Sequence, residues 1–157
     1  MEVAVIGVQE FSSIATGFFA LDGIVKAAPV RILVTRIVTP GKLVVLFTGD
    51  VASVEASLGA GRQCGAEDML DELFIPNLHP GVIPAIEGPV AVAEWDALGI
   101  IECLSVAAGI VAADLAAKEA DVQIPEIRLA GGMGGKSTIK VMGPLEDVQA
   151  SLSVAAG

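Results

Sequence analysis

Short apolar runs alternate along the chain with stretches of helical spacing. In the first half, an apolar run at 3–11 predicts a buried strand, and apolar residues at helical spacing follow from Ile14 to Ala27. Further strands are predicted at 30–38, 43–48 and 69–75, with a helix from 51 to about 61 and a short closing segment at 79–86. This β-α-β-β-α-β order predicts a ferredoxin-like α+β unit with an antiparallel sheet and both helices on one face.

The second half repeats the first. A shift of 92 residues places Gly7 on Gly99, Glu10 on Glu102 and Lys26 on Lys118, and the shift becomes 94 after a two-residue insertion. The repeat predicts strands at 97–103, 122–130 and 136–142, and helices at 105–119 and from about 144. We therefore expect a first domain at 1–86, a linker at 87–96 and a second domain at 97–157. The second domain lacks the counterpart of the last strand, so either the sequence is shortened or that strand comes from elsewhere. As written, the second sheet would expose an unpaired edge.

Composition changes this picture in two ways. Nine basic against 19 acidic residues give a net charge of −10, which argues against nucleic acid as a partner. Hydrophobic residues make up 54% of the chain, yet charged or proline residues interrupt every apolar stretch, so no membrane span is predicted. The start Met1-Glu2 lacks the basic region of a signal peptide, which predicts a cytoplasmic protein. We expect the apolar surplus to be buried against other copies of the chain.

Several short strings occur in both copies or in characteristic positions. They are Ile6–Glu10 with Ser13–Ala15, Gly99–Glu102 with Ser105–Ala107, Pro40–Lys42 and Ile75–Pro80. Together they resemble the tandem-domain, trimer-forming shell proteins of bacterial microcompartments, and most of all the propanediol-type branch of that family. The resemblance implies a structural protein without enzymatic activity in the microcompartment shell. It also implies a homotrimeric, pseudohexameric tile that joins other shell proteins, encloses enzymes and passes small polar metabolites through a central pore.

The resemblance places both strand-connecting turns at this pore. A glycine-rich turn can approach its symmetry mates closely and present backbone N–H groups to a passing anion. For the second turn, an ordinary flexible hairpin remains an open alternative. The predicted pore-lining residues are Val38, Thr39, Pro40, Gly41, Gly131, Gly132, Met133, Gly134 and Gly135.

The propanediol-type relative carries an iron–sulfur cluster at its pore, held by a cysteine where this chain has Thr39. A threonine hydroxyl is a poor iron ligand compared with a thiolate. Cys64 and Cys103 lie away from the turn in the sequence. We therefore predict neither this cofactor nor another metal.

The string Gly131 to Thr138 also resembles a phosphate-binding loop. That loop reads G-x-x-x-x-G-K-[ST] and leads into a helix, whereas this chain has Ala130 at the first glycine and a predicted strand after Lys136. A nucleotide-dependent enzyme is therefore the weakest reading. A ferredoxin-like regulatory module that binds a small ligand is the stronger alternative to a shell protein.

In the resembling family, the lysine near the end of the first helix lies at the tile edge. The matching tile-edge residues are Lys26 and Lys118, with Asn77 and His79 contributing. The alternative for each lysine is a solvated helix end paired with the aspartate four residues earlier. His79 is the only histidine, so a Ser-His or Cys-His pair cannot occur in both copies, and no catalytic residues are predicted.

Overall fold

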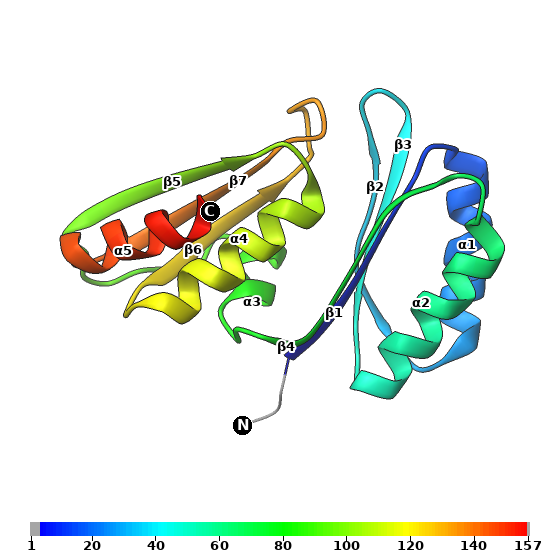
Figure 1. Ribbon diagram of the computed structural model, residues 1–157, viewed down its shortest axis with the longest axis horizontal. Helices are drawn as coiled ribbons and strands as arrows, with labels where there is room; N and C mark the ends of the chain where they lie inside the picture. The colour runs from blue at the N-terminus through cyan, green and yellow to red at the C-terminus, as the bar shows by residue number, and fades with distance from the viewer. Residues whose placement is uncertain (1–3, 157) are drawn as a thin grey trace. The chain divides into compact units, whose positions relative to one another are not determined.

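The computed structural model describes residues 4–156, which form two compact units divided between Leu78 and His79. Figure 1 labels their helices and strands. Residues 1–3 and 157 lie outside this described range. The predicted domain ranges include these residues, and the prediction from Met1-Glu2 about a signal peptide falls on them.

The first unit is a four-stranded antiparallel sheet covered by two helices on one face (Figure 1). Its strand order is β2-β3-β1-β4, which is the ferredoxin-like arrangement and confirms the predicted α+β class. The elements are β1 (Ala4–Phe11), α1 (Ile14–Ala27), β2 (Arg31–Val38), β3 (Lys42–Thr48), α2 (Val51–Gly65) and β4 (Met69–Leu78).

Local capping explains where the two helices begin. The Ser13 side chain accepts a hydrogen bond from the Thr16 N–H, and the Asp50 carboxylate accepts one from the Ser53 N–H. Hydrogen bonds from the Ser53 backbone and hydroxyl hold the pKa of Asp50 below its usual value. Helix α1 ends at Ala27, before Pro29, because proline restricts the residue before it to extended backbone.

The core of the first unit lies between the sheet and its helices. Strands β1 and β3 contribute alternate apolar side chains, and both helices contribute the residues that face them. Met69 and Phe74 of β4 pack against the margin of this core. Its buried members are Val5, Phe11, Ala20, Ile24, Leu43, Val45, Phe47, Val54 and Leu58.

The second unit repeats this plan with one strand fewer. Its sheet order is β5-β7-β6, which equals β1-β3-β2 of the first unit without the counterpart of β4. Ser105 caps α4 as Ser13 caps α1, by accepting from the Ala108 N–H. The elements are β5 (Ala97–Cys103), α4 (Val106–Glu119), β6 (Gln123–Leu129), β7 (Ser137–Gly143) and α5 (Leu145–Ala155).

The sequence misplaced two element ends in the first unit. Strand β4 continues past the predicted end at Ile75 to Leu78, because it is an edge strand, where Pro76 is tolerated. Helix α2 continues past Gly61 to Gly65, and the missing Cβ of Gly61 lets the helix pack closely on Gln9.

The predicted closing segment at 79–86 is also different in the structure. It contains the short helix α3 (Val82–Glu87), which packs on β6 and α4. Because its packing partners come from the second half, the compact units divide at residue 78, whereas the sequence placed the end of the first domain at 86.

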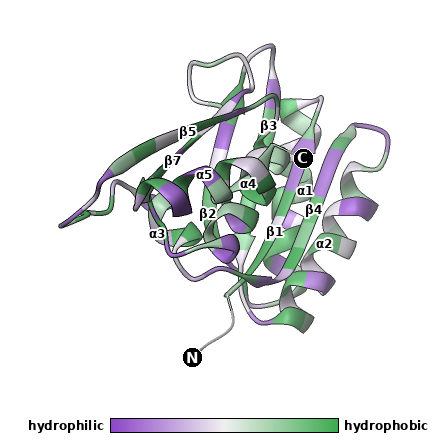
Figure 2. Cartoon of the chain, turned by 60° about the vertical axis from the view of Figure 1, so that its left-hand side comes forward, coloured by the Kyte–Doolittle hydropathy of each residue, from purple (hydrophilic) through white to green (hydrophobic). Residues whose placement is uncertain are grey.

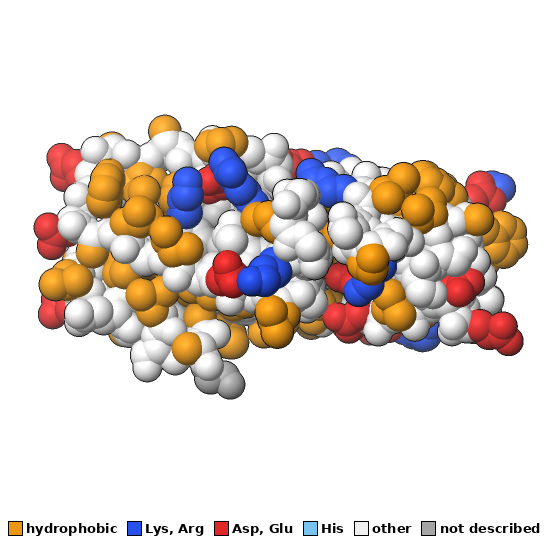
Figure 3. All heavy atoms as spheres, turned by 90° about the horizontal axis from the view of Figure 1, so that it is seen from above, with side chains coloured by type: hydrophobic (Ala, Val, Ile, Leu, Met, Phe, Trp, Pro, Cys, Tyr) orange, Lys and Arg blue, Asp and Glu red, His pale blue; other side chains and the backbone are white. Residues whose placement is uncertain are grey.

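Apolar side chains remain at the surface of both units, as the space-filling view in Figure 3 shows. Phe19 of α1 is 62% exposed and Ile100 of β5 is 62% exposed. Within residues 4–156, no helix combines the length and apolar character needed to cross a bilayer.

Candidate functional site

The first predicted pore turn is the tight connection between β2 and β3. The Gly41 N–H donates to the Val38 carbonyl at 2.8 Å, and the Thr39–Pro40 peptide bond is cis. Gly41 has a φ of 113°, a conformation that favours glycine. Val38 is buried and anchors the turn, whereas Thr39 and Pro40 are exposed at its tip.

The second predicted pore turn is longer and connects β6 to β7. The Ala130 N–H donates to the Lys136 carbonyl at 2.8 Å and closes the loop at its base. Gly132, Gly134 and Gly135 have φ values of 70°, 61° and 88°, so the loop depends on glycine at three positions. Gly131, Gly132 and Gly134 are exposed, and Met133 is half-buried.

The second turn is not a phosphate-binding loop. Lys136 is followed by β7, and the required helix is replaced by a strand. Ser137, at the position of the magnesium-binding hydroxyl in such loops, is buried, and its hydroxyl donates to the Ser105 carbonyl at 2.8 Å. The Ser137 hydroxyl is therefore engaged in anchoring the start of α4, and a strand stands where the motif needs a helix.

Each turn is flanked by a lysine–glutamate pair that the sequence analysis missed. Lys136 Nζ lies 2.8 Å from Glu102 Oε1, and Lys42 Nζ lies 3.9 Å from Glu10 Oε2. The repeat alignment could have indicated these ion pairs, because it superimposes the two lysines and also the two glutamates. The pairs attach the end of each turn to the neighbouring strand of its own sheet.

The predicted tile-edge lysines occupy equivalent places but have different surroundings. Both form the expected i,i+4 pairs, with Lys26 Nζ 2.6 Å from Asp22 and Lys118 Nζ 2.6 Å from Asp114. The Lys26 side chain is 72% exposed, whereas that of Lys118 is 39% exposed. Asn77 is exposed near the end of β4.

His79 shares a hydrogen-bond partner with Lys118. Its backbone N–H donates to Asp114 Oδ1 at 2.7 Å, while Asp114 Oδ2 binds Lys118. The His79 ring nitrogen Nδ1 accepts from the Gly81 N–H at 3.2 Å. Asp114 therefore brings together two of the four predicted edge residues, and its counterpart Asp22 is exposed.

The cysteines and carboxylates offer no metal centre in the described residues. No group of three or more His, Cys, Asp and Glu side chains within 4–156 is arranged to hold an ion. Cys64 and Cys103 are half-buried free thiols, and burial raises the pKa of Cys103, which favours its neutral form. The Thr39 hydroxyl lies on the exposed tip of the first turn.

Comparison with known proteins identifies a family for both units. The BMC domain matches the chain twice, over residues 5–78 and 97–157. A Citrobacter freundii protein, bacterial microcompartment shell protein PduT, is 39% identical over 150 residues, which cover 96% of this chain and 82% of that protein.

Solved structures give the same result for the fold. The crystal structure of a microcompartments protein from Desulfitobacterium hafniense has a TM-score of 0.93 and 42% identity, covering 99% of this chain and 86% of that one. The fused permuted hexameric shell protein MSM0275 from the RMM microcompartment has a TM-score of 0.71 and 18% identity, covering 98% and 82%. The second similarity extends to the fold alone.

Proposed function

The chain belongs to the BMC-domain family and is a structural shell protein of a bacterial microcompartment, and from this premise we propose that three copies form one pseudohexagonal tile with a central pore. Shell proteins of this family assemble into tiles with other shell proteins. The observation that carries the proposal is the presence of two BMC domains in one chain. Three such chains supply six domains, which is the number that a hexagonal tile needs.

The pore of this tile is formed by the two turns described above. Exposed glycines in the second turn and the Thr39 hydroxyl in the first suit a polar opening, because they offer N–H and O–H groups without bulky side chains. The pore passes small polar metabolites. Val38 was among the predicted lining residues, but its side chain is buried and only anchors the first turn. The proposed lining is therefore Thr39, Pro40, Gly41, Gly131, Gly132, Met133, Gly134 and Gly135.

The protein itself catalyses no reaction and holds no cofactor. The resemblance described above places Thr39 at the position of a cluster-binding cysteine in the propanediol-type branch, and a hydroxyl binds iron poorly. The tile lies in the shell of a cytoplasmic compartment, beside other shell proteins and facing the enclosed enzymes. Nucleic acid and membrane are not its partners, in keeping with its net charge of −10.

The tile edge includes Lys26, Lys118, Asn77 and His79. Lys26 is the stronger candidate for a direct contact with a neighbouring tile, because its side chain is the more exposed of the two lysines. Lys118 and His79 contribute through Asp114, which holds both.

Electron microscopy and native mass measurement test the assembly. We expect extended hexagonal sheets and a tile of three times the 15.9 kDa chain mass. Lys26→Ala should yield intact tiles that no longer form sheets, and Lys26→Arg, which keeps the charge at the same exposed position, is the matched control. Discrete oligomers that gain thermal stability with a small ligand would contradict the proposal and favour a regulatory module.

Disulfide trapping tests the pore. A cysteine at position 39 in a Cys64→Ser, Cys103→Ser background should form disulfide-linked pairs of chains on mild oxidation, because three copies meet at the axis. Thr35→Cys is the control, because this exposed residue lies on β2, roughly 13 Å along the chain from position 39. Equal cross-linking of both variants, or none at position 39, would remove the turn from the axis.

A further inference from the structure

Basic residues gather beside the two proposed pore turns, 38–41 and 131–135, although the chain as a whole is acidic. Of the nine basic residues, five lie within five positions of a turn. Three acidic side chains form ion pairs with four of these basic ones. Five minus three leaves a charge of +2 beside the turns of a chain whose net charge is −10. The five basic residues are Arg36, Lys42, Arg128, Lys136 and Lys140, and the three acidic ones are Glu10, Glu102 and Glu126.

The repeat places the same kind of charge on both sides of each turn. Arg36 lies on β2 opposite Val44 of β3, and Arg128 lies on β6 opposite Thr138 of β7. Arg36 is three residues, or roughly 10 Å, before Thr39 along the strand. A lysine follows each turn at an equivalent position. Figure 2 shows such charged positions as hydrophilic interruptions of largely hydrophobic strands.

The basic side chains beside the turns are more accessible to solvent than most of their acidic partners. The Glu10 side chain is 7% exposed, against 37% for Lys42. The Glu126 side chain is 13% exposed, whereas its partner Arg128 is 66% exposed. Glu102, at 58%, is the one of these three acids that remains accessible. Because the attraction between charges falls with distance, a dissolved ion near either turn interacts first with the exposed cations.

Other acidic residues of the first unit lie at the same end of its sheet but farther from the turn. Glu67 and Asp68 lie between α2 and β4, and the Asp68 carboxylate accepts hydrogen bonds from the hydroxyls of Ser12 at 3.0 Å and Thr16 at 2.6 Å. Asp71 lies on β4, which β1 separates from β3. Two strand spacings, roughly 10 Å, therefore separate Asp71 from the strand that follows the turn.

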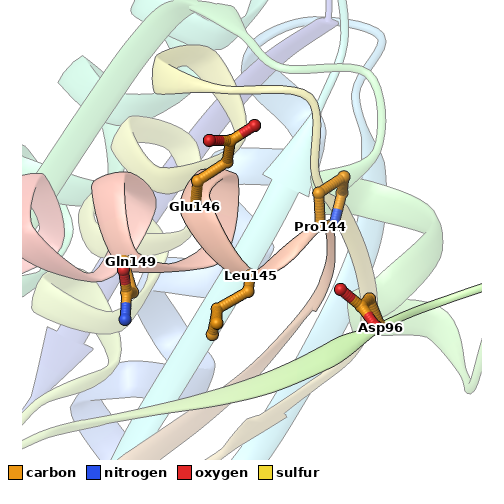
Figure 4. A pocket seen from close by; sticks show the side chains of 5 residues that line it. All are labelled: Asp96, Pro144, Leu145, Glu146 and Gln149. Carbon is orange, nitrogen blue, oxygen red and sulfur yellow. The ribbon is translucent and has the colours of Figure 1, made fainter.

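The opposite end of the second sheet is acidic. Strand β7 runs from the second turn to Gly143, and a hollow of about 280 Å³ lies beyond this end of the strand, at the start of α5 (Figure 4). Its charged lining residues are Asp96 and Glu146, with Pro144, Leu145 and Gln149 between them. The charge thus changes sign along β7, so an anion is favoured at the turn end and disfavoured at the hollow.

We propose that the pore admits small anionic metabolites in preference to cationic ones, and that the arginine and lysine beside each turn attract them. This inference rests on the proposed pore and adds the charge of what passes through it. A tile of three chains carries six such arginines and six such lysines. An arginine guanidinium matches carboxylate and phosphate groups in shape, and a narrow opening lined by one sign of charge concentrates ions of the other sign.

Charged thiol reagents measure the potential at the turn. Thr39→Cys, in the Cys64→Ser, Cys103→Ser background, reacts with an anionic methanethiosulfonate that carries a sulfonate and with a cationic one that carries a trimethylammonium group. Ser153→Cys, at an exposed position of α5, is the reference. In about 50 mM salt, the anionic-to-cationic rate ratio should be at least about fivefold higher at position 39 than at position 153. The difference should nearly vanish in about 500 mM salt, which screens the charges.

A matched pair of variants assigns the potential to the proposed residues. Arg36→Gln should lower the rate ratio at position 39 at least about threefold, because it removes one positive charge per chain near the turn. Arg31→Gln is the control, because this exposed arginine lies at the other end of β2, roughly 26 Å from Thr39, and should leave the ratio unchanged. Thermal melts check that both variants remain folded.

The mass of the tile and the disulfide cross-link at position 39 are measured on the same preparations. With a three-chain mass and a cross-link present, equal rate ratios at positions 39 and 153 would overturn the anion preference and leave the pore in place. Equal effects of Arg36→Gln and Arg31→Gln would also overturn it, because the potential would then not arise beside the turn. A tile without three chains would remove the pore itself, and this inference with it.

Discussion

At the scale of single residues, the absence of a side chain matters as much as its presence. Gly109 of α4 lies directly against Ser137 of β7, and a Cβ at this position would collide with the serine side chain. The Ser137 hydroxyl also holds the Ser105 carbonyl. Helix and strand can approach this closely only with glycine at position 109.

Gly109→Ala should therefore destabilise the protein by about 1–3 kcal/mol, the usual cost of overpacking. Gly59→Ala is the control, because it lies in α2 with open space around its Cβ position and should stabilise the helix by about 0.5–1 kcal/mol. Urea unfolding measures both. A neutral Gly109→Ala would mean that β7 can move away from α4 at little cost.

Asp114 and its counterpart Asp22 contribute differently to stability, although both are aspartates at equivalent positions of the repeat. Its carboxylate is 9% exposed and binds both Lys118 and the His79 N–H, whereas Asp22 is 54% exposed. Asp114→Ala should cost about 1–3 kcal/mol of unfolding free energy, because a partly buried donor and cation lose their partner. Asp22→Ala should cost no more than about 0.5 kcal/mol. Similar losses in the two variants would contradict this assignment.

At the scale of elements, a serine hydroxyl connects the two long helices of each unit in the same way. The buried Ser57 hydroxyl donates from α2 to the Ile24 carbonyl of α1 at 3.0 Å, and Ser151 donates from α5 to the Ala116 carbonyl of α4 at 2.9 Å. These residues are equivalent under the repeat. The alignment could have identified the serine pair, but not the carbonyls that accept from it.

Strands β6 and β7 are joined by a charged cluster that makes stability depend on pH. Glu126 Oε2 lies 2.7 Å from Lys140 Nζ, and Glu126 Oε1 lies 2.8 Å from Arg128 Nε. Its hydrogen bonds with Lys140, and then with Arg128, lower the pKa of Glu126. A lowered folded-state pKa stabilises the protein above the unfolded-state value, and this contribution disappears as pH falls.

We expect the unfolding free energy of the wild type to fall more steeply than that of Glu126→Gln below about pH 4.5, near the ordinary glutamate pKa. Above that pH the variant should be the less stable of the two, because it has lost the ion pairs. Urea unfolding at several pH values measures this. Parallel pH profiles would show that Glu126 does not contribute to the dependence.

At the scale of the whole molecule, acidic charge and exposed apolar side chains act in opposite directions on assembly. The net charge of −10 repels neighbouring tiles, while residues such as Phe18 and Phe19 favour contact. Raising NaCl from about 50 to 500 mM should therefore increase the fraction of protein in sheets, because salt screens the repulsion and leaves apolar contacts intact. Sedimentation and electron microscopy measure this fraction. Dissolution of sheets at high salt would contradict this prediction, because it would show that ion pairs between tiles outweigh the general repulsion.

The sequence was enough to predict the repeat, the fold class and the order of the strands and longer helices, because apolar periodicity and caps such as Ser13 and Ser105 act locally along the chain. It also located both glycine turns and both i,i+4 pairs. The tertiary structure decided what depends on distant partners: the assignment of α3 to the second unit, the second role of Asp114 and the lysine–glutamate pairs beside the turns. Packing also decided how deeply each repeated residue is buried. Leu58 and Leu152 have equivalent positions in the repeat, yet Leu58 is 1% exposed and Leu152 is half-buried, a difference that the sequence pattern does not contain.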